Sequence, residues 1–220
     1  AFLVTAIVSV SYSEAIGATQ WLGTNTIGLW KSTDGLNFTK FTNAALQTSA
    51  TTYCAPNTFT IDANGDLFMG TKRSAYGTGG GRIYKCTNGT NWTLVRTLTA
   101  NGRVQLVASK TTVGRMFALC ENYATGLPVI RRSTDAFATV DTNVPLPVSS
   151  GSQPPAANDF CRGQAFYDLM IGMNPTNDSE VYVGGIEIFK NTDAFKASPV
   201  AGDWSQLTDW TVNPTANGNA

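Results

Sequence analysis

A short polar turn recurs four times along the chain, and it constrains the fold more than any other feature. The copies read KSTDGLNF from residue 31, KCTNGTNW from residue 85, RSTDAFAT from residue 132 and KNTDAFKA from residue 190. Successive copies begin about 50 residues apart, with connecting segments of unequal length. A period of that size is typical of β-propellers and related repeat arrays. We refer to these four segments as the repeated turns.

Each repeated turn follows a short apolar segment of strand character: TIGLW, GRIY, LPVIR or IEIF. Two further strand-like segments come before it, as in TFTID and DLFMGT, and a fourth comes after it, as in WTLVRTL. No helical periodicity extends beyond a turn or two, so the pattern predicts an all-β protein. One four-stranded unit cannot bury both faces of its sheet, but radial stacking of units does so.

The sequence therefore predicts a β-propeller built of four-stranded antiparallel blades. We expect residues 1–220 to form one propeller-type domain or part of one. The units are expected at about 1–45, 46–100, 101–145 and 160–212, with 146–159 as a Pro- and Ser-rich surface loop. Four blades are at the low end for propellers, so we expect further blades or domains from a longer chain.

The residues of the repeated turn indicate a structural role. An Asp in STDG can accept hydrogen bonds from backbone N–H groups just ahead of it, and Gly35 or Gly89 can adopt the positive φ of a tight hairpin. Phe38 and Trp92 are then expected to fold back onto the sheet. These carboxylates are thus predicted to hold the turn rather than to react.

The pattern S-x-D-G-x-x-[WF] after an apolar strand resembles the Asp-box, or BNR, repeat of sialidase-like and sortilin-like propellers. The resemblance implies that the boxes lie at the blade periphery, away from the central site. Cys86 and Asn191 stand where Ser is usual, Asn88 where Asp is usual, and Ala136 and Ala194 where Gly is usual. The positions that match the box are Ser32, Asp34, Gly35, Phe38, Cys86, Asn88, Gly89, Trp92, Ser133, Asp135, Asn191 and Asp193.

Residues 164–195 resemble a segment of large secreted Asp-box proteins, many of which Bacteroidetes-type bacteria export by a type IX secretion route. The resemblance implies a secreted or cell-surface protein. The composition agrees with this, because only 14% of the residues are charged and the polarity comes from Thr, Ser, Asn and Gly.

Composition also excludes several classes of function. The 15 basic and 15 acidic residues form no basic stripe, so no nucleic-acid partner is predicted, and no apolar run is long enough to span a membrane. The absence of His argues against zinc and against a His-dependent triad. The segment YGTGGGR at 76–82 lacks the Lys-Ser/Thr of a phosphate loop. NPTNDSE at 174–180 could offer oxygen ligands to calcium but is better interpreted as a turn. No metal and no cofactor are predicted.

Four cysteines, Cys54, Cys86, Cys120 and Cys161, have no C-x-x-C spacing. They are either buried free thiols or two disulfides formed in an oxidising compartment. For the second case we predict the pairs Cys54–Cys161 and Cys86–Cys120.

The candidate binding residues are Arg162, Tyr167 and Asp168. Asp168 begins the innermost strand of the fourth unit, where propellers usually meet their ligands, Tyr167 precedes it, and Arg162 lies in the loop before. A turn or strand-start role for Asp168 is the structural alternative. A sialidase is not expected, because no Arg occurs in the early Arg-Ile-Pro context of that family and Glu is scarce.

The primary hypothesis is a non-catalytic module that binds a glycan or a protein through these residues. One alternative is a glycoside hydrolase on the same scaffold, with Asp168 as first candidate and a second carboxylate roughly 5–10 Å away. A second alternative is an architectural segment of a large adhesin or filament.

Overall fold

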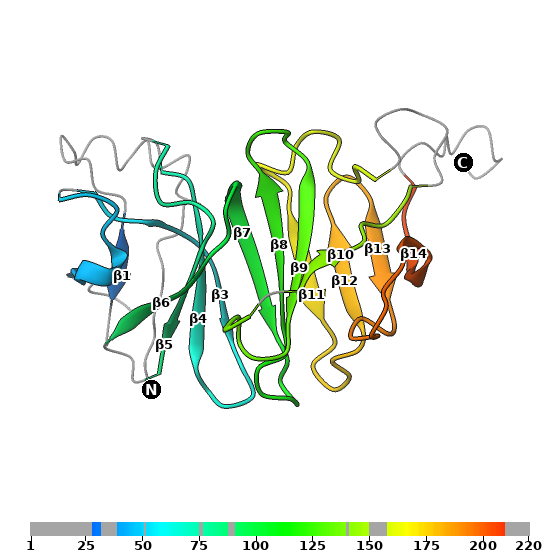
Figure 1. Ribbon diagram of the computed structural model, residues 1–220, viewed down its shortest axis with the longest axis horizontal. Coiled ribbons are helices and arrows are strands. Elements are labelled where there is room, and N and C mark those ends of the chain that lie inside the picture. The colour runs from blue at the N-terminus through cyan, green and yellow to red at the C-terminus, as the bar shows by residue number, and fades with distance from the viewer. Residues whose placement is uncertain are drawn as a thin grey trace, which may run out of the picture.

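The structure is a computed structural model, and it describes residues 28–31, 39–50, 52–74, 77–87, 91–139, 141–149 and 158–209. These residues form three complete four-stranded antiparallel sheets and one two-stranded sheet, shown in Figure 1. The helices of the described residues are two single-turn 3-10 helices, η1 (Ala44–Leu46) and η2 (Ala201–Asp203). No helix in these ranges has the length and hydrophobicity of a membrane span.

The sheets follow the chain as successive meanders, and we number them as blades 1 to 4. Blade 1 contains β1 (Leu29–Lys31) and β2 (Thr39–Phe41). Blade 2 contains β3 (Ala55–Ile61), β4 (Leu67–Lys72), β5 (Arg82–Cys86) and β6 (Trp92–Thr97). Blade 3 contains β7 (Asn101–Ala108), β8 (Met116–Asn122), β9 (Pro128–Ser133) and β10 (Asp141–Val144). Blade 4 contains β11 (Met170–Met173), β12 (Val181–Gly184), β13 (Ile188–Asn191) and β14 (Trp204–Gln206).

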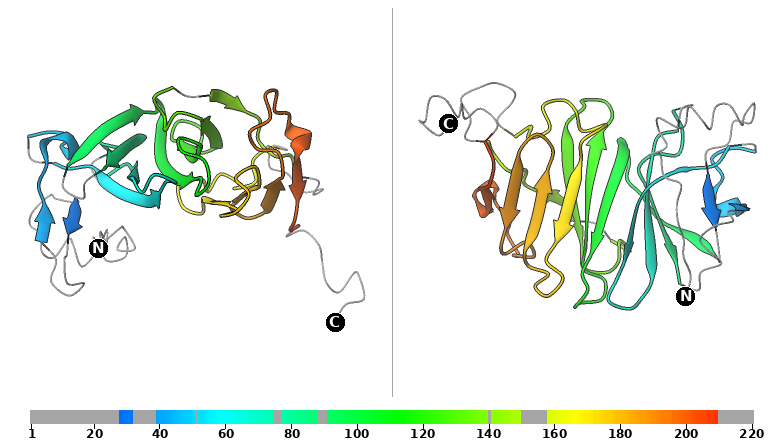
Figure 2. Two further views of the ribbon diagram at one scale, coloured as in Figure 1. Left: turned by 90° about the horizontal axis from the view of Figure 1, so that it is seen from below. Right: turned by 180° about the vertical axis from the view of Figure 1, so that it is seen from behind.

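Adjacent blades pack side by side, as the two views of Figure 2 show. The first strand of each complete blade is its innermost strand, because β7 contacts β3 on one side and β11 on the other. Strands within a blade pair in sequence order, and all pairs are antiparallel. The prediction of an all-β fold built of four-stranded antiparallel propeller blades is confirmed.

The core consists of three hydrophobic clusters, one at each interface between neighbouring blades. Leu29 of blade 1 packs against Met69 and Tyr84 of blade 2, and Phe68 and Ile83 of blade 2 pack against blade 3. The third cluster joins blades 3 and 4. Both faces of blades 2 and 3 are therefore covered, which explains why Met116 to Cys120 of β8 are all fully buried.

The third repeated turn, between β9 and β10, is held by its own side chains. The Ser133 hydroxyl accepts hydrogen bonds from the N–H groups of Asp135 (3.1 Å) and Phe137 (2.7 Å) and donates to Asp135 Oδ1 (2.7 Å). The Asp135 carboxylate accepts from the N–H (3.0 Å) and hydroxyl (2.8 Å) of Thr139. Ala136 and Phe137 have φ angles of 57° and 67°, so the left-handed conformation occurs here without glycine.

In the fourth repeated turn, between β13 and β14, Asn191 Oδ1 accepts a hydrogen bond from the N–H of Asp193 (2.8 Å), at the position where Ser133 accepts from Asp135 in the third turn. In the second turn, Trp92 is buried and its ring meets Phe59 edge-on, with 6.2 Å between centroids. The remaining predicted box residues, Ser32, Asp34, Gly35, Phe38, Asn88 and Gly89, lie outside the described residues.

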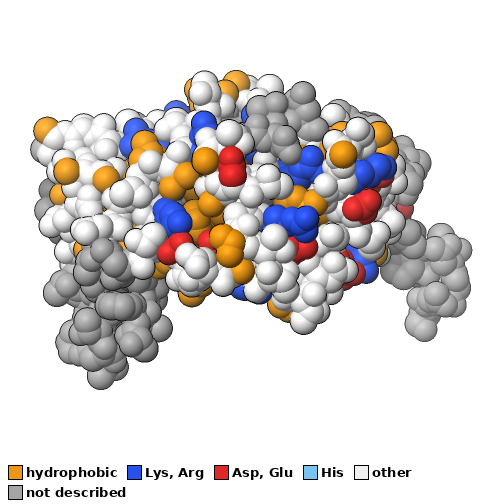
Figure 3. Space-filling view, turned by 60° about the horizontal axis from the view of Figure 1, so that its bottom comes forward, with side chains coloured by type: hydrophobic (Ala, Val, Ile, Leu, Met, Phe, Trp, Pro, Cys, Tyr) orange, Lys and Arg blue, Asp and Glu red, His pale blue; other side chains and the backbone are white. Residues whose placement is uncertain are grey.

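Arginines join the third and fourth repeated turns to the blade before each of them. Arg96 of blade 2 donates from Nε to the carbonyl of Phe137 (3.0 Å) and from Nη2 to the carbonyl of Ala138. Arg132 of blade 3 donates to the carbonyls of Ala194 (3.1 Å) and Lys196 (2.8 Å) in the turn of blade 4. Figure 3 shows basic and acidic side chains next to one another at several places near this end of the blades, where ion pairs such as Lys85–Asp66 (2.7 Å) lie.

Of the two alternatives for the cysteines, the structure has the first: all four are buried free thiols, and the disulfides of the second alternative are not formed. Cys54 belongs to the cluster between blades 1 and 2, and Cys161 packs at the interface of blades 3 and 4. Cys86 and Cys120 lie in clusters on opposite sides of blade 2, and Cys54 and Cys161 are separated by blades 2 and 3. A disulfide requires Cα atoms within about 7 Å of each other. Cys54 and Cys161 stand at matching points of the repeat, but in a radial array matching points of different units lie in different blades.

Candidate functional site

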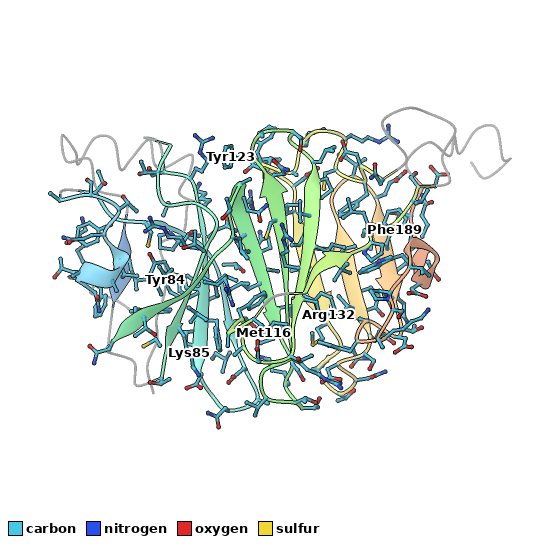
Figure 4. The ribbon with its side chains drawn as sticks, viewed as in Figure 1. Tyr84, Lys85, Met116, Tyr123, Arg132 and Phe189 are labelled. Atoms are coloured by element: carbon cyan, nitrogen blue, oxygen red, sulfur yellow. The ribbon has the colours of Figure 1, made fainter. Side chains whose placement is uncertain are left out.

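The meander topology separates the repeated turns from the candidate binding residues. The turns connect the third and fourth strands and therefore lie at the lower end of the blades in Figure 1. Arg162, Tyr167 and Asp168 precede β11, and so they lie at the upper end, where the innermost strands begin. Figure 4 labels Tyr123 of the β8–β9 connection at the upper end and Lys85 and Arg132 lower down.

The loop before β11 is shaped by its own hydrogen bonds. The buried Asp159 carboxylate accepts from the N–H groups of Cys161 (3.2 Å) and Gly163 (2.7 Å). Arg162 has a φ of 52°, a left-handed conformation that is uncommon for a non-glycine residue. Farther along, the N–H groups of Tyr167 (2.8 Å) and Asp168 (3.1 Å) both donate to the carbonyl of Gln164. These bonds give the loop a defined conformation as it enters β11.

Arg103, at the start of β7, holds this loop from the neighbouring blade. Its Nη1 donates to the carbonyls of Phe166 (3.2 Å) and Tyr167 (2.7 Å), and its own backbone N–H donates to Glu121 Oε2 (3.1 Å). Burial lowers the pKa of Arg103, while the negative charges of Asp168 and Glu121 oppose that shift. The site is thus assembled from blades 3 and 4 together.

Asp168 carries a buried carboxylate beside this arginine. Neither of its carboxylate oxygens accepts a hydrogen bond of normal geometry from the described residues. Burial raises the pKa of Asp168, and its own backbone N–H, the Arg103 guanidinium and the Cys161 thiol offset only part of that rise. The pKa of the Cys161 thiol is raised as well, first by burial and then by the charges of Asp168 and Asp159. A carboxyl group in this environment can accept hydrogen bonds from a ligand or hold a proton above the usual pH.

Arg162 contacts a different group from the other two predicted residues, Tyr167 and Asp168. Its guanidinium is 3.8 Å from Glu187 Oε1, and Glu187 is fully buried in the turn between β12 and β13. The N–H of Glu187 donates to the carbonyl of Phe160 (3.3 Å), so this turn holds the loop by a backbone hydrogen bond. The structure therefore brings Tyr167 and Asp168 together with Arg103 and places Arg162 against Glu187.

Two adjacent aromatic rings are exposed above the buried charges. Phe166 is 61% exposed and Tyr167 is 70% exposed, with ring centroids 6.5 Å apart and ring planes inclined by 49°. Tyr123 is half-exposed on the same end of blade 3, and the Arg73 guanidinium lies 4.8 Å from its ring centroid. The upper end of blades 2 to 4 thus combines exposed aromatic surface with buried polar groups.

Sequence reasoning missed Arg103, Phe166 and Glu187. Phe166 is next to Tyr167, so its position in the same loop was an available signal. Arg103 begins the innermost strand of its own unit at about the point where Asp168 begins its strand, which is also a readable signal. Glu187 carried no such signal. No group of three or more His, Cys, Asp or Glu side chains in the described ranges is arranged to hold a metal ion.

The blades define a protein of the β-propeller type, and the match to one solved structure agrees with this fold. The crystal structure of a GH74 enzyme from Niastella koreensis matches with a TM-score of 0.52 at 18% identity, over 80% of this chain and 26% of that chain. The GH74 xyloglucanase from Xanthomonas campestris matches with a TM-score of 0.49 at 12% identity, over 74% of this chain and 24% of that chain. The present chain spans about a quarter of the length of these structures. No protein-family model matches the sequence, and a search of curated proteins found no match.

Proposed function

We propose that this protein is an extracellular propeller module that binds a glycan, without cleaving it, at the upper end of blades 3 and 4. The binding residues are Phe166, Tyr167 and Asp168, with Arg103 fixing the loop that carries them. One observation supports this most strongly: an exposed aromatic pair adjoins a buried carboxylate whose oxygens accept no hydrogen bond of normal geometry from the described residues.

The chemistry of these groups suits a sugar ring. A flat aromatic face provides apolar contact area with two rotatable bonds, so little conformational entropy is lost when a ligand packs on it. An unpaired buried acceptor costs about 1–3 kcal/mol, and a ligand hydroxyl that donates to Asp168 would recover part of that cost. Small-molecule sites typically combine aromatic lining with a few polar groups that orient the ligand.

The proposal assigns a separate role to the lower end of the blades. We infer that the repeated turns are Asp-boxes, and that Asp135 and its counterparts maintain the hairpins. The hydrogen bonds of Asp135 go to Thr139 and Ser133 of its own turn, which supports this assignment. The likeness of residues 164–195 to secreted Asp-box proteins supports an extracellular location, and the chain as a whole is proposed to be part of a larger propeller.

The test is a glycan-array screen with the complete chain, followed by calorimetric titration of each hit. Tyr167→Ala and Asp168→Asn are expected to weaken binding by about tenfold or more, since each removes interactions worth about 1.4 kcal/mol or more. Asp135→Asn, a matched carboxylate change at the opposite end, should leave the Kd unchanged. An array without a hit, or a Kd that neither Tyr167→Ala nor Asp168→Asn alters, would contradict the proposal. So would binding to a glycoprotein that persists after its glycans are removed.

A glycoside hydrolase is the second candidate, because burial raises the pKa of Asp168 in the direction required of a general acid. Hydrolysis needs a second carboxylate about 5–10 Å away. Asp159 is a poor candidate for the second carboxylate, because its two oxygens already accept hydrogen bonds from the backbone N–H groups of Cys161 and Gly163. Incubation of each bound glycan with the protein decides between the two: release of reducing ends that Asp168→Asn abolishes would establish the enzyme, and binding without release would establish the module.

A further inference from the structure

Lys72, Arg73 and Tyr123 form a surface at the upper end of blades 2 and 3, which we call the basic platform. Lys72 is the last residue of β4, Arg73 follows it, and Tyr123 lies in the β8–β9 connection, near the top of Figure 4. The Arg73 guanidinium lies over the ring of Tyr123, with Cζ 4.8 Å from the ring centroid. Arg73 is exposed and Tyr123 is half-exposed. Blades 2 and 3 each have a neighbouring blade on both sides, so the platform belongs to the interior of the array.

The guanidinium of Arg73 is held in one orientation. Its Nε donates to the carbonyl of Gly77 (3.2 Å), and one of its faces covers the ring of Tyr123. Its Nη1 and Nη2 donate no hydrogen bond to the described residues. A planar guanidinium that is fixed in this way presents parallel N–H groups, which match the oxygens of an oxyanion.

The glycine-rich segment that follows Arg73 supports this orientation. A Cβ on Gly80 would lie 2.6 Å from Arg73 Cγ and 2.5 Å from the carbonyl oxygen of Gly102. Only glycine therefore lets the segment pass between Arg73 and the start of β7. The N–H of Gly81 donates to the carbonyl of Gly102 (3.0 Å) and joins the segment to blade 3. The glycines of YGTGGGR, which do not form a phosphate loop, thus position an arginine side chain.

Positive charge predominates at this end of blade 2. Alternation along β4 places Lys72 on the same side as Phe68, which packs against blade 3. Lys72 is half-buried, and its pKa is lowered first by burial and then by the positive charge of Arg103. The acidic residues of blade 2, Asp62 and Asp66, lie at the opposite end, in the β3–β4 turn. An anion at the basic platform would therefore stabilise the charged form of Lys72.

The basic platform adjoins the glycan site through Gly102 and Arg103. A Cβ on Gly102 would lie 3.3 Å from Tyr123 Cβ and 2.4 Å from Glu121 Oε2, so a side chain at this position would collide with Glu121. Glu121 Oε2 accepts a hydrogen bond from the N–H of Arg103 (3.1 Å). Arg103 Nη1 in turn donates to the carbonyl of Tyr167 (2.7 Å). These contacts connect the exposed ring of Tyr123 to the loop that carries Tyr167.

We propose that the basic platform binds a negatively charged group, a carboxylate or a sulfate, on the same glycan that packs on Phe166 and Tyr167. The ligand is then an acidic oligosaccharide with at least two occupied positions. The unit beside Asp168 is neutral, because a second negative charge would be repelled there, and the unit beside Tyr123 carries the charge to Arg73. This inference rests on the proposed function, and it adds the class of glycan and a second binding position.

The test is an array of neutral, uronic acid-containing and sulfated oligosaccharides, screened with the complete chain. Each acidic hit is then titrated by calorimetry before and after its carboxyl groups are reduced or its sulfates are removed. We expect the charged form to bind about tenfold more tightly than the uncharged form, and the treatment that weakens binding identifies the group. The difference should shrink in 1 M salt, where the Debye length is about 3 Å.

Two variants connect this difference to the basic platform. Arg73→Gln and Lys72→Gln should each reduce the preference for the charged form and leave the Kd of the uncharged form unchanged. Lys110→Gln is the matched control, because it removes one positive charge from an exposed lysine at the lower end of blade 3. It should keep the full preference. Tyr167→Ala should weaken both forms alike, and thermal melting establishes that each variant is folded.

The outcomes separate this inference from the proposed function. Neutral hits that bind as tightly as acidic ones would overturn the inference alone, and so would a preference that both Arg73→Gln and Lys72→Gln leave intact or that Lys110→Gln reduces equally. Binding of the acidic form that Tyr167→Ala does not weaken would also overturn it, because one glycan would not occupy both positions. An array without a hit would overturn the inference and the proposed function together.

Discussion

Removing the carboxylate of Asp135 tests whether the repeated turn is a structural element. In Asp135→Ala the N–H and hydroxyl of Thr139 lose their acceptor, and the Ser133 hydroxyl loses the partner to which it donates. Loss of a comparable capping side chain costs about 0.5–2 kcal/mol. Because the turn is exposed but three donors are affected, we expect a loss of about 1–2 kcal/mol in the free energy of unfolding. For a domain of this size that corresponds to a decrease in Tm of about 2–8 °C.

The same variant has a defined pH dependence. Burial acts to raise the pKa of Asp135, but the hydrogen bonds from Ser133 and Thr139 outweigh it and the pKa is lowered. A carboxyl group with a lowered folded-state pKa stabilises the protein above its unfolded pKa, near 4, and loses that contribution as the pH falls through the folded value. The difference in Tm between wild type and Asp135→Ala should therefore be largest at neutral pH and should shrink toward pH 2.

Thermal melts followed by circular dichroism at pH 7 and at acidic pH measure both effects. Thr134→Ala, a change at an exposed neighbour in the same turn, is the control and should alter Tm by less than about 1 °C. The reasoning fails if Asp135→Ala leaves the Tm at pH 7 unchanged. It also fails if this variant abolishes glycan binding while the protein keeps its stability, because the carboxylate would then serve the ligand.

Three further predictions concern individual residues. Ala136→Gly should stabilise the protein by roughly 0.5 kcal/mol, because Ala136 has a φ of 57° that glycine adopts freely. Ala138→Gly in the same turn should destabilise the protein. Thermal melts in which Ala138→Gly is the more stable variant would refute this prediction. Asp168→Asn should raise the Tm at pH 7 and leave it unchanged near pH 3. The folded-state pKa of Asp168 is raised, so the wild-type protein loses stability as the pH rises through that pKa and the carboxyl group becomes charged. A lower Tm of Asp168→Asn at pH 7 would contradict the burial of this charge. Burial raises the pKa of Cys54 and of Cys120 to about 12, and all four thiols are buried. A thiol reagent should therefore modify none of the cysteines in the folded protein and all four after denaturation without reductant. Modification of fewer than four cysteines after denaturation would reveal a disulfide.

The fold could be predicted because its information is local and repeated. Strands such as GRIY and LPVIR precede a turn with fixed chemistry, and their recurrence every 50 residues or so leaves radial stacking as the way to bury both faces of each sheet. The structure places Cys86, Ser133 and Asn191 at the ends of the third strands β5, β9 and β13. The positive φ expected at the glycine position of the repeated turn occurs in the third turn, at Ala136, but not in the fourth, at Ala194.

The site could be predicted only where one loop carries it. Tyr167 and Asp168 are neighbours in sequence, and the loop before an innermost strand marks them. Arg103 and Glu187 reach the same loop from other strands, through contacts between blades that depend on the angle and spacing of the sheets. The disulfide prediction failed for the same reason, because matching positions in the repeat were assumed to lie close together and the blades hold Cys54 and Cys161 in separate clusters.

The central claim is that each repeated turn packs onto the blade before it, and the contact between Phe117 of blade 3 and Phe195 in the turn of blade 4 tests this most directly. Their rings meet edge-on with centroids 5.1 Å apart, although the residues are far apart in sequence. A double-mutant cycle with Phe117→Leu and Phe195→Leu, measured by chemical denaturation, should give a coupling energy of about 0.5–1.5 kcal/mol. Effects that add to within about 0.3 kcal/mol would show that the two rings do not meet and would contradict the arrangement of the blades.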